Sequence, residues 1–525
     1  MQMGAFGRTW AVATPHASAT EAAVVAYERG GNAIDAALAA ATTLAVVYPH
    51  MCGVGGDLFA LVQHPAGDVV AINASGRAPE GADPATAAAA GRGRMPEHGP
   101  LSVTVPGAVS GWKALHERGA NLPWADAFTA AVTYAYGGVS VAPSLALTLA
   151  EDADRLRRDP GLADVFFPRG LPAAVLEPVR QPALGASLQE IADLGPAALY
   201  GGELGARYAV GLRELGVPIE LADMAGHRAD LRAPLRARHR DVDVLVHPPN
   251  SQGFVLLEAL SVIERLGIDP DPLGLDAAVI ADVLRATARD RDLHLADEDA
   301  MRLQPSTLLE DGHLAALAAE VRDGSSAAPP PPTHRSGDTI ALVTADVEGR
   351  GVSLIQSLFD GFGAGLLERA TGVVAQSRGA CFTLEPGHPN VLAPGKRPLH
   401  TLMPVLVQRE GRLEAVAGTM GGFAQPQIVA MTLLRAFGLG MDAAGSVAAP
   451  RWLVGWMSQE GPRPDVVAES GVPAEVLDRL KAGGYRVDTV GERDESVGHA
   501  NLIRAVAGGF DAGSDPRADG GAAAS

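Results

Sequence analysis

A single threonine, Thr339, stands where the sequence could place a nucleophile. It lies between a proline-rich stretch, residues 325–336, and an apolar run, Ile340–Thr344, that has the pattern of a strand. A hydroxyl becomes a nucleophile when a neighbouring base can take its proton. A threonine at the start of a strand is more commonly structural, because β-branched residues favour strands. Position alone therefore leaves Thr339 open between the two roles.

Two other segments carry residue types that occur at binding sites. Gly53–Gly56 resembles a phosphate-binding loop, but no Lys-Ser/Thr pair follows it, so we expect a plain turn before a hairpin. The run 289–299 groups arginine and aspartate residues around His294, and its i,i+3 and i,i+4 spacing favours a solvated helix face. The sequence thus predicts neither a nucleotide site nor a metal site.

The elements that would position a site change in type along the chain. The segments with helical pattern are 18–29, 33–47, most of 107–320, and 427–437. The segments with strand pattern pair as hairpins: 58–63 with 69–73, 340–344 with 352–357, and 405–408 with 413–418. This alternation predicts helices layered on antiparallel sheets.

Composition narrows the class of protein. The chain has 525 residues, 47% of them hydrophobic, and a formal net charge of −19, which argues against binding nucleic acid. Its two cysteines, Cys52 and Cys381, form no CxxC pair, so neither a cysteine zinc site nor a disulfide framework is expected. We see no secretory signal and no apolar run long enough for a membrane span. We therefore expect a cytoplasmic protein that does not contact membranes.

Eight short motifs follow one another in a fixed order. They are Gly30–Ala37, Pro49–Gly56, Val105–Gly107, Pro248–Gly253, Phe362–Gly363, Pro394–Pro398, Gly418–Gly422 and Ala449–Arg451. Each motif is weak alone. In this order, with a proline-rich segment before Thr339, they make the chain resemble the gamma-glutamyltransferase (glutathione hydrolase) family of N-terminal-nucleophile hydrolases, over about residues 11–505.

The resemblance implies an α+β fold, a four-layer α-β-β-α sandwich assembled from two products of self-cleavage between Asp338 and Thr339. The large product, 1–338, would contain an αβ part, the helical region and the proline-rich linker. The small product, 339–525, would begin with the nucleophile and end in a tail, about 511–525, that we expect to be disordered. The two products would stay together, and further pairing into a dimer of heterodimers is left open.

The resemblance also implies roles for the residues around the cut. Thr339 would be the nucleophile, and its newly freed α-amine, with a reference pKa near 7.7–8.0, would be the base. Ser357 takes the place of a family threonine whose hydroxyl bonds the nucleophile. The backbone N–H groups of Gly421 and Gly422 would stabilise the oxyanion. No metal or organic cofactor is required.

The substrate pocket departs from the family pattern. Ser75 stands where the family has an arginine for the substrate α-carboxylate, and Arg77, two positions later, is either its substitute or a surface arginine. Cys381 stands where the family has an acid for the α-amine, and it is either a core cysteine or part of the pocket.

Four further residues complete the altered pocket. Arg378 stands near Cys381, and Phe359 replaces a family asparagine. His400 and Thr401 replace a serine pair and keep hydrogen-bonding capacity.

These changes predict the class of substrate. A γ-glutamyl head carries an ammonium group that would lack an acid partner near Cys381. We therefore expect hydrolysis of a small amide with a carboxylate and no α-amine, such as oxamate or a glutaryl or succinyl amide. Transfer to an amine acceptor stays open. The alternatives are a true gamma-glutamyltransferase, and a ligand-binding homologue that neither matures nor catalyses.

Overall fold

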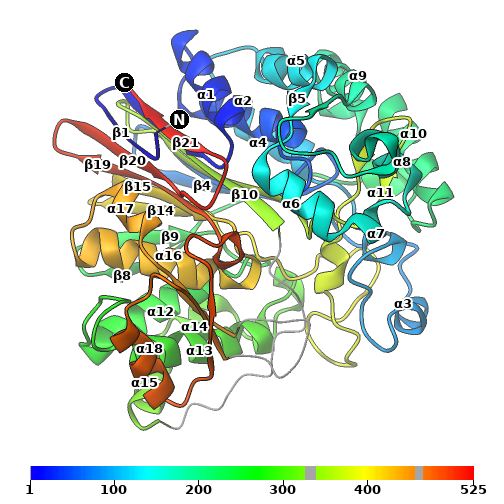
Figure 1. The fold of residues 1–525 in the computed structure, drawn as a ribbon. Helices are drawn as coiled ribbons and strands as arrows, with labels where there is room; N and C mark the ends of the chain where they lie inside the picture. Colours follow the sequence, from blue (N-terminus) through cyan, green and yellow to red (C-terminus); the bar gives the residue numbers. More distant parts are fainter. Residues whose placement is uncertain (1, 325–337, 456–464) are drawn as a thin grey trace.

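Two seven-stranded antiparallel sheets dominate the computed structural model, which describes residues 2–324, 338–455 and 465–525 (Figure 1). The first sheet has, in order, β21 (Gly521–Ala524), β2 (Trp10–Thr14), β10 (Asp338–Asp346), β11 (Gly351–Phe359), β3 (Asp57–Gln63), β4 (Val69–Ala74) and β7 (Asp230–Arg232). The second has β1 (Gly4–Gly7), β20 (Gly509–Ser514), β19 (Ala500–Val506), β15 (Arg412–Thr419), β14 (Val405–Arg409), β9 (Val242–Val246) and β8 (Leu235–His239).

The sheets pack face to face, and each is covered by helices on its other side. Along β10, Val343 and Ala345 pack with Leu406 and Val416 of the second sheet. The intervening Leu342 joins the core formed with the helices. This alternation is the period of a strand buried on both faces. It places Thr339 and Ser357, by parity, at the inter-sheet face.

A different set of helices covers the outer face of each sheet. Behind the first sheet lie α1 (Ala17–Glu28), α2 (Ala33–Val47), α4 (Ala108–His116), α5 (Thr129–Gly137) and α9 (Pro182–Leu194). Behind the second lie α12 (Gly253–Leu266), α13 (Ala277–His294), α15 (Asp311–Arg322), α16 (Gln425–Leu433), α17 (Ala443–Ala448) and α18 (Ala474–Ala482). The four-layer α-β-β-α sandwich expected from the sequence is therefore confirmed.

Shorter elements complete the fold around these layers. The helices are α3 (Pro84–Ala90), α6 (Pro143–Glu151), α7 (Ala153–Leu156), α8 (Pro160–Phe166), α10 (Glu203–Glu214), α11 (Leu221–Ala225) and α14 (Pro305–Leu308). The strands are β5 (Val139–Ser140) with β6 (Pro178–Val179), β12 (Leu367–Glu368) with β13 (Val373–Val374), and β16 (Trp452–Val454), β17 (Val466–Glu469) and β18 (Val487–Val490).

Helix α2 shows how local sequence and packing agree. Asn32 caps it by accepting from Ile34 N at 2.8 Å, and the Asp35 carboxylate accepts from Asn32 N at 2.9 Å. All of its residues are buried, because it lies between α1, α5 and the first sheet. An Ala-rich helix that is apolar all round is suited to that position.

Each sheet contains strands from before position 338 and strands from after it. In the first sheet, β10 lies between β2 and β11, and β11 pairs with β3. In the second, β14 pairs with both β9 and β15. A cut before Thr339 would therefore leave two chains joined through continuous hydrogen-bond ladders. The proline-rich linker, 325–336, lies outside the described residues.

The C-terminal tail was predicted wrongly. Residues 511–525 are ordered: β20 pairs with β19 and β1, and β21 pairs with β2 at the edge of the first sheet. The composition, rich in Gly, Ala, Ser and Asp, suggests low complexity. Small residues nevertheless suit these strands, since backbone ladders need no large side chains and Ala512 and Ala522 pack between the sheets.

The run 289–299 also differs from its expected solvated face. Asp290 and Arg291 of α13 are only 4% and 3% exposed. Arg291 Nη1 donates to the carbonyl of Phe423 at 3.1 Å, so this turn of α13 faces the interior.

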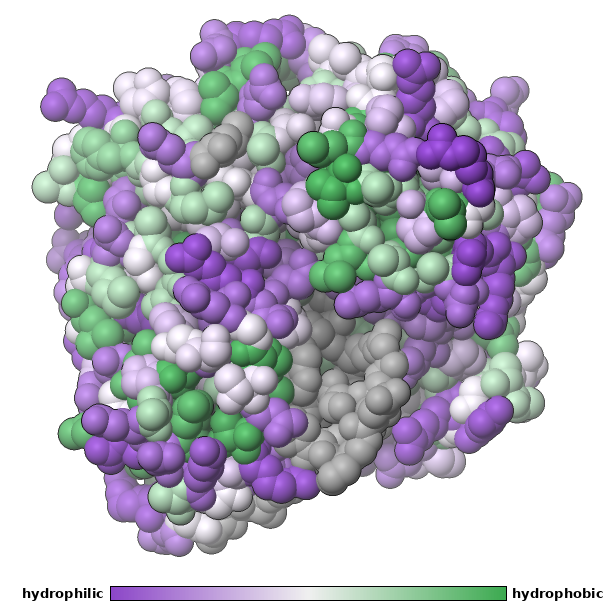
Figure 2. Space-filling model, in the orientation of Figure 1, coloured by the Kyte–Doolittle hydropathy of each residue, from purple (hydrophilic) through white to green (hydrophobic). Residues whose placement is uncertain are grey.

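The surface drawn in Figure 2 is mostly hydrophilic, with apolar residues in small separate patches. Within the described ranges, no helix has the length and apolar character needed to cross a bilayer.

Candidate active site

Thr339 and Ser357 meet across the hairpin of β10 and β11. The ladder shifts register between Asp338 and Ile340: Thr339 lies opposite two residues, Ser357 and Leu358, so β11 carries the extra residue of a bulge. Thr339 Oγ1 donates to Ser357 Oγ at 3.0 Å, and both side chains are buried. Ser357 Oγ in turn donates to the carbonyl oxygen of Asp338 at 2.6 Å. The Ser357 hydroxyl therefore contacts both Thr339, the expected nucleophile, and the Asp338 carbonyl that Thr339 would attack in self-cleavage.

The backbone holds this serine in place. Phe359 N donates to Ser357 Oγ at 2.8 Å, and Phe359 has a positive φ of 84°, a conformation that non-glycine residues rarely adopt. Such outliers cluster at functional sites, because the surrounding structure must hold them. Ser357 thus has its hydrogen-bonding capacity directed toward the cleavage point.

Acidic groups surround the residue before the cut. Burial raises the pKa of the Asp338 carboxyl well above its usual range, and the neighbouring Asp360, Glu495 and Asp152 raise it further. The bond to Thr339 therefore lies beside a carboxyl group whose protonated form burial and like charges favour.

A glycine turn at the end of β15 supplies free backbone donors. Gly421 and Gly422 have φ values of 144° and 53°, which L side chains rarely adopt. In the part of the chain that the structure describes, the N–H groups of these two glycines donate to no other group. Successive backbone N–H groups in such a turn form an anion-binding concavity.

Long-range contacts fix this turn. The Gln252 amide, at the start of α12, donates to Gly422 O at 2.9 Å and to Thr401 O at 2.8 Å. Met420 N donates to His499 O at 2.9 Å.

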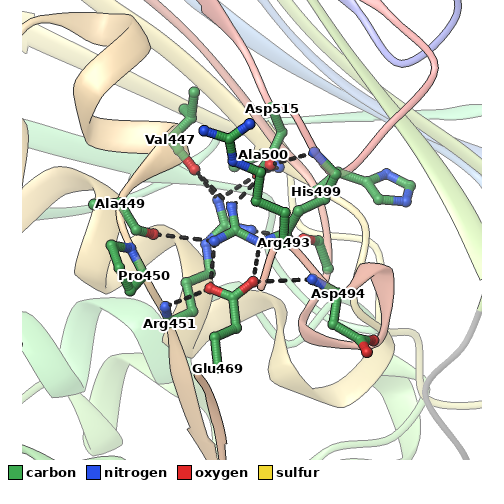
Figure 3. Close-up of polar contacts among 12 residues, drawn as sticks. Val447, Ala449, Pro450, Arg451, Glu469, Arg493, Asp494, His499, Ala500 and Asp515 are labelled. Atoms are coloured by element: carbon green, nitrogen blue, oxygen red, sulfur yellow. Dashed lines mark hydrogen bonds and ion pairs between the residues drawn. The ribbon is translucent and has the colours of Figure 1, made fainter. Parts of the chain in front are cut away.

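Next to His499, a buried ion network supports the chain (Figure 3). Arg451 donates to Gly498 O at 2.6 Å and pairs with Asp515, which also accepts from Ala500 N at 2.8 Å. Arg517 joins Asp515 to Glu469, with ion pairs of 2.9 and 2.5 Å. The tail expected to be disordered therefore contributes buried charges beside the glycine turn.

A second group of predicted residues gathers around Arg378. Its guanidinium lies 4.3 Å from the ring centroid of Phe359, and Nη1 donates to Thr401 Oγ1 at 3.0 Å and lies 3.6 Å from Cys381 Sγ. Among the described residues, Nε and Nη2 have no hydrogen-bond partner and no acidic side chain forms an ion pair with Arg378. Burial raises the pKa of the Cys381 thiol, so this sulfur stays neutral and provides no counter-charge.

Asp57 is the acid whose charge acts on Arg378, and its carboxylate oxygens already accept hydrogen bonds from other residues. Asp57 accepts from His400 Nε2 at 3.0 Å, from Gly76 N at 2.9 Å and from Gln376 Nε2 at 2.9 Å. Burial, and then Arg378, lower the pKa of His400 well below its usual range, so His400 is neutral. The sequence analysis missed Asp57. In the sequence, the one available signal was that Asp57 directly follows the Gly53–Gly56 turn. The structure pairs it with Ser357 across β3 and β11.

Ser75 and Arg77, the two candidates for the position of the family's arginine, have different surroundings. Ser75 is buried, and its Oγ donates to Asn73 Oδ1 at 2.7 Å. Arg77 is 44% exposed and contacts Gly395 O at 3.0 Å and Asp297 at 3.3 Å. Arg77 therefore has the contacts of a surface arginine.

Comparison with known proteins identifies the family of this chain. The gamma-glutamyltranspeptidase family model matches residues 19–525. The chain belongs to the gamma-glutamyltranspeptidase family. The resemblance read from the eight motifs is thereby confirmed, as is the expectation of an enzyme: the chain is a self-processing amidohydrolase of this family.

Its relatives within the gamma-glutamyltranspeptidase family are diverse. The chain is 37% identical to the oxamate amidohydrolase proenzyme of Klebsiella pneumoniae, with 97% of each chain covered. It is 34% identical to the glutathione hydrolase-like YwrD proenzyme of Bacillus subtilis, with 99% of each covered. Cephalosporin acylase from Bacillus halodurans has a similar structure, with a TM-score of 0.90 at 30% identity, over 100% of this chain and 97% of that one.

Proposed function

We propose that this chain cuts itself before Thr339 and then hydrolyses small amides whose acyl group carries a carboxylate and no ammonium group. The observation that carries the proposal is Arg378. It is a buried cation without an ion pair among the described residues, and two of its nitrogen atoms lack acceptors. Buried charges are ordinarily paired, so a substrate carboxylate is the partner that this guanidinium lacks.

Maturation would begin at the Thr339 hydroxyl. Its oxygen attacks the Asp338 carbonyl carbon, whose oxygen accepts from Ser357. The hydroxyl proton passes to the amide nitrogen of Thr339, the C–N bond breaks, and the acyl group is left on the threonine oxygen. Water hydrolyses this ester, which frees the Asp338 carboxylate and the α-amine of Thr339.

Turnover would use the same hydroxyl with the new amine as base. The amine takes the hydroxyl proton, the oxygen attacks the substrate amide, and the negative charge on the carbonyl oxygen is stabilised by the N–H groups of Gly421 and Gly422. The substrate amine leaves with a proton, and water resolves the acyl-enzyme. Arg378 holds the far carboxylate throughout, because Phe359 and Thr401 fix its guanidinium.

The two products are proposed to remain paired through the shared sheets after the cut. Cys52 and Cys381 are free, buried thiols, which supports a reducing compartment and hence the cytoplasm.

Two substrates that differ by one group test the acyl preference. Glutaryl-p-nitroanilide is γ-glutamyl-p-nitroanilide without the α-ammonium group. Because an unpaired buried donor costs about 1–3 kcal/mol, and more when charged, we expect kcat/KM for the glutaryl amide to be at least about tenfold higher. Oxamate and succinyl amides then define the preferred length. An equal or higher value for the γ-glutamyl amide would refute the preference.

A denaturing gel tests the nucleophile separately. The wild type should give two bands, and Thr339→Ala one band at full length. Thr344→Ala is the matched control, since Thr344 lies on the same strand and bonds Ala33 O at 2.7 Å. It should still cut. A wild type that stays as one band would favour the non-maturing alternative.

A further inference from the structure

Three helices behind the second sheet bring three potential metal ligands together. Glu258 lies on α12, Asp290 on α13 and His313 on α15, and one ligand atom from each lies within 4.8 Å of the others. His313 Nε2 is 2.7 Å from Asp290 Oδ2 and 3.6 Å from Glu258 Oε1. The two carboxylates are buried, whereas the His313 side chain is 29% exposed and offers a route from solvent.

Glu258 is the residue that points to a ligand. It is fully buried, and within the described ranges neither of its carboxylate oxygens accepts a hydrogen bond. Buried carboxylates are nearly always bonded, because the desolvated charge is costly. The single N–H on His313 Nε2 is already directed to Asp290.

The nearest basic side chain does not relieve this carboxylate. Arg289 makes two hydrogen bonds to Glu320, at 2.5 and 2.9 Å, and its Nε is 3.9 Å from Asp290 Oδ1. The donor set therefore holds two carboxyl groups and one imidazole. Burial raises the pKa of the Glu258 carboxyl to about 8, so this carboxyl is mostly protonated in the metal-free protein.

We propose that Glu258, Asp290 and His313 bind one divalent transition-metal ion, with zinc or manganese as the class of ion. Two carboxylate oxygens and one imidazole nitrogen form a ligand set that these ions accept, and Ca²⁺ or Mg²⁺ prefers oxygen alone. On binding, His313 gives up its Nε2 proton to solvent and presents the lone pair.

The site would have a structural role, because it joins the helices that brace the glycine turn. Helix α12 begins directly after Gln252, whose amide binds Gly422 O. Arg291, next to Asp290, binds Phe423 O. A metal fixing α12 to α13 and α15 would therefore stiffen the support of the turn without contacting substrate.

Titration of tag-free, EDTA-dialysed protein with ZnCl₂ and MnCl₂ tests the inference, with bound metal counted by elemental analysis. One saturable site per chain and a Tm raised by a few degrees are expected. Glu258→Gln and His313→Ala should each weaken binding at least about tenfold. His294→Ala is the matched control, since this histidine lies on α13 outside the ligand set, and it should bind as the wild type does.

Two outcomes would overturn the inference. One is a wild type that binds less than one ion per chain at millimolar metal. The other is binding that survives unchanged in both ligand variants. Wild-type titration needs no folded variant, so a failure of Glu258→Gln to fold leaves the first outcome decisive.

Discussion

Replacing Arg378 by methionine should remove recognition of the acyl carboxylate and leave the fold standing. Methionine fills much of the same volume beside Phe359 but carries no charge and no donor. The free protein loses a buried cation that has no ion pair among the described residues. The substrate complex loses the two donors, Nε and Nη2, that are free for a carboxylate.

The magnitudes differ for activity and stability. A hydrogen bond to a charged group contributes about 1.5–3 kcal/mol, so two lost bonds lower kcat/KM by about 10²- to 10⁴-fold. For the fold, removing two unsatisfied buried N–H groups gains about 2–6 kcal/mol. Losing the Phe359 cation–π contact and the Thr401 bond costs about 3–4 kcal/mol. The free energy of unfolding should therefore change by no more than about 2–3 kcal/mol.

The assay compares two acyl groups and two arginines. Glutaryl-p-nitroanilide and its uncharged relative pentanoyl-p-nitroanilide should differ strongly with the wild type and little with Arg378→Met. Arg397→Met is the control, because Arg397 is also buried but pairs with Asp230 at 2.5 Å. Breaking that partly exposed pair should lower the stability of the fold without changing the ratio between acyl groups. An equal loss of activity on both anilides in Arg378→Met would refute the role of Arg378.

Three further perturbations follow from the site. Ser357→Ala removes the donor to the Asp338 carbonyl, so self-cleavage on a gel time course should slow about 10²- to 10³-fold, and an unchanged rate would contradict the contact. In a Thr339→Ala precursor, the raised pKa of Asp338 makes the fold lose stability as pH rises above about 4, the unfolded value. Adding Asp338→Asn should therefore raise the Tm at pH 7, with the gain vanishing toward pH 4; a constant difference would count against it. Asp515→Asn leaves Arg451 without its buried ion pair and should cost about 3–5 kcal/mol, measured as a lower urea midpoint.

Local pattern predicted much of the fold. Helix 33–47 and the paired strands were found because Gly, Pro and capping residues mark their ends and the apolar periods differ. The layer order came from the family resemblance. The tail failed because strands β20 and β21 gain their stability from partners distant in sequence, which composition does not report.

The candidate site was likewise predicted in part from the sequence. Thr339 and Ser357 were predicted as partners, and the structure brings their hydroxyl groups within 3.0 Å. Arg378, Cys381 and Thr401 were named one by one, but their convergence is a tertiary fact. Asp57 was missed because a carboxylate at a strand start looks ordinary until its three donors are seen.

Charge placement links these findings. A γ-glutamyl pocket needs a cation and an anion for the two charges of the substrate head. The position that the resemblance assigns to the family's acid holds the neutral thiol of Cys381, and the position it assigns to the family's arginine holds the uncharged Ser75. Of the arginines close by, Arg77 pairs with Asp297 and Arg397 with Asp230. Arg378 alone among these three forms no ion pair in the described chain; the charge of Asp57 acts on it, but the Asp57 oxygens are hydrogen-bonded to His400, Gly76 and Gln376. A buried guanidinium with two free donors favours an anion and disfavours an ammonium group, which is why the carboxylate is proposed and the amine is not.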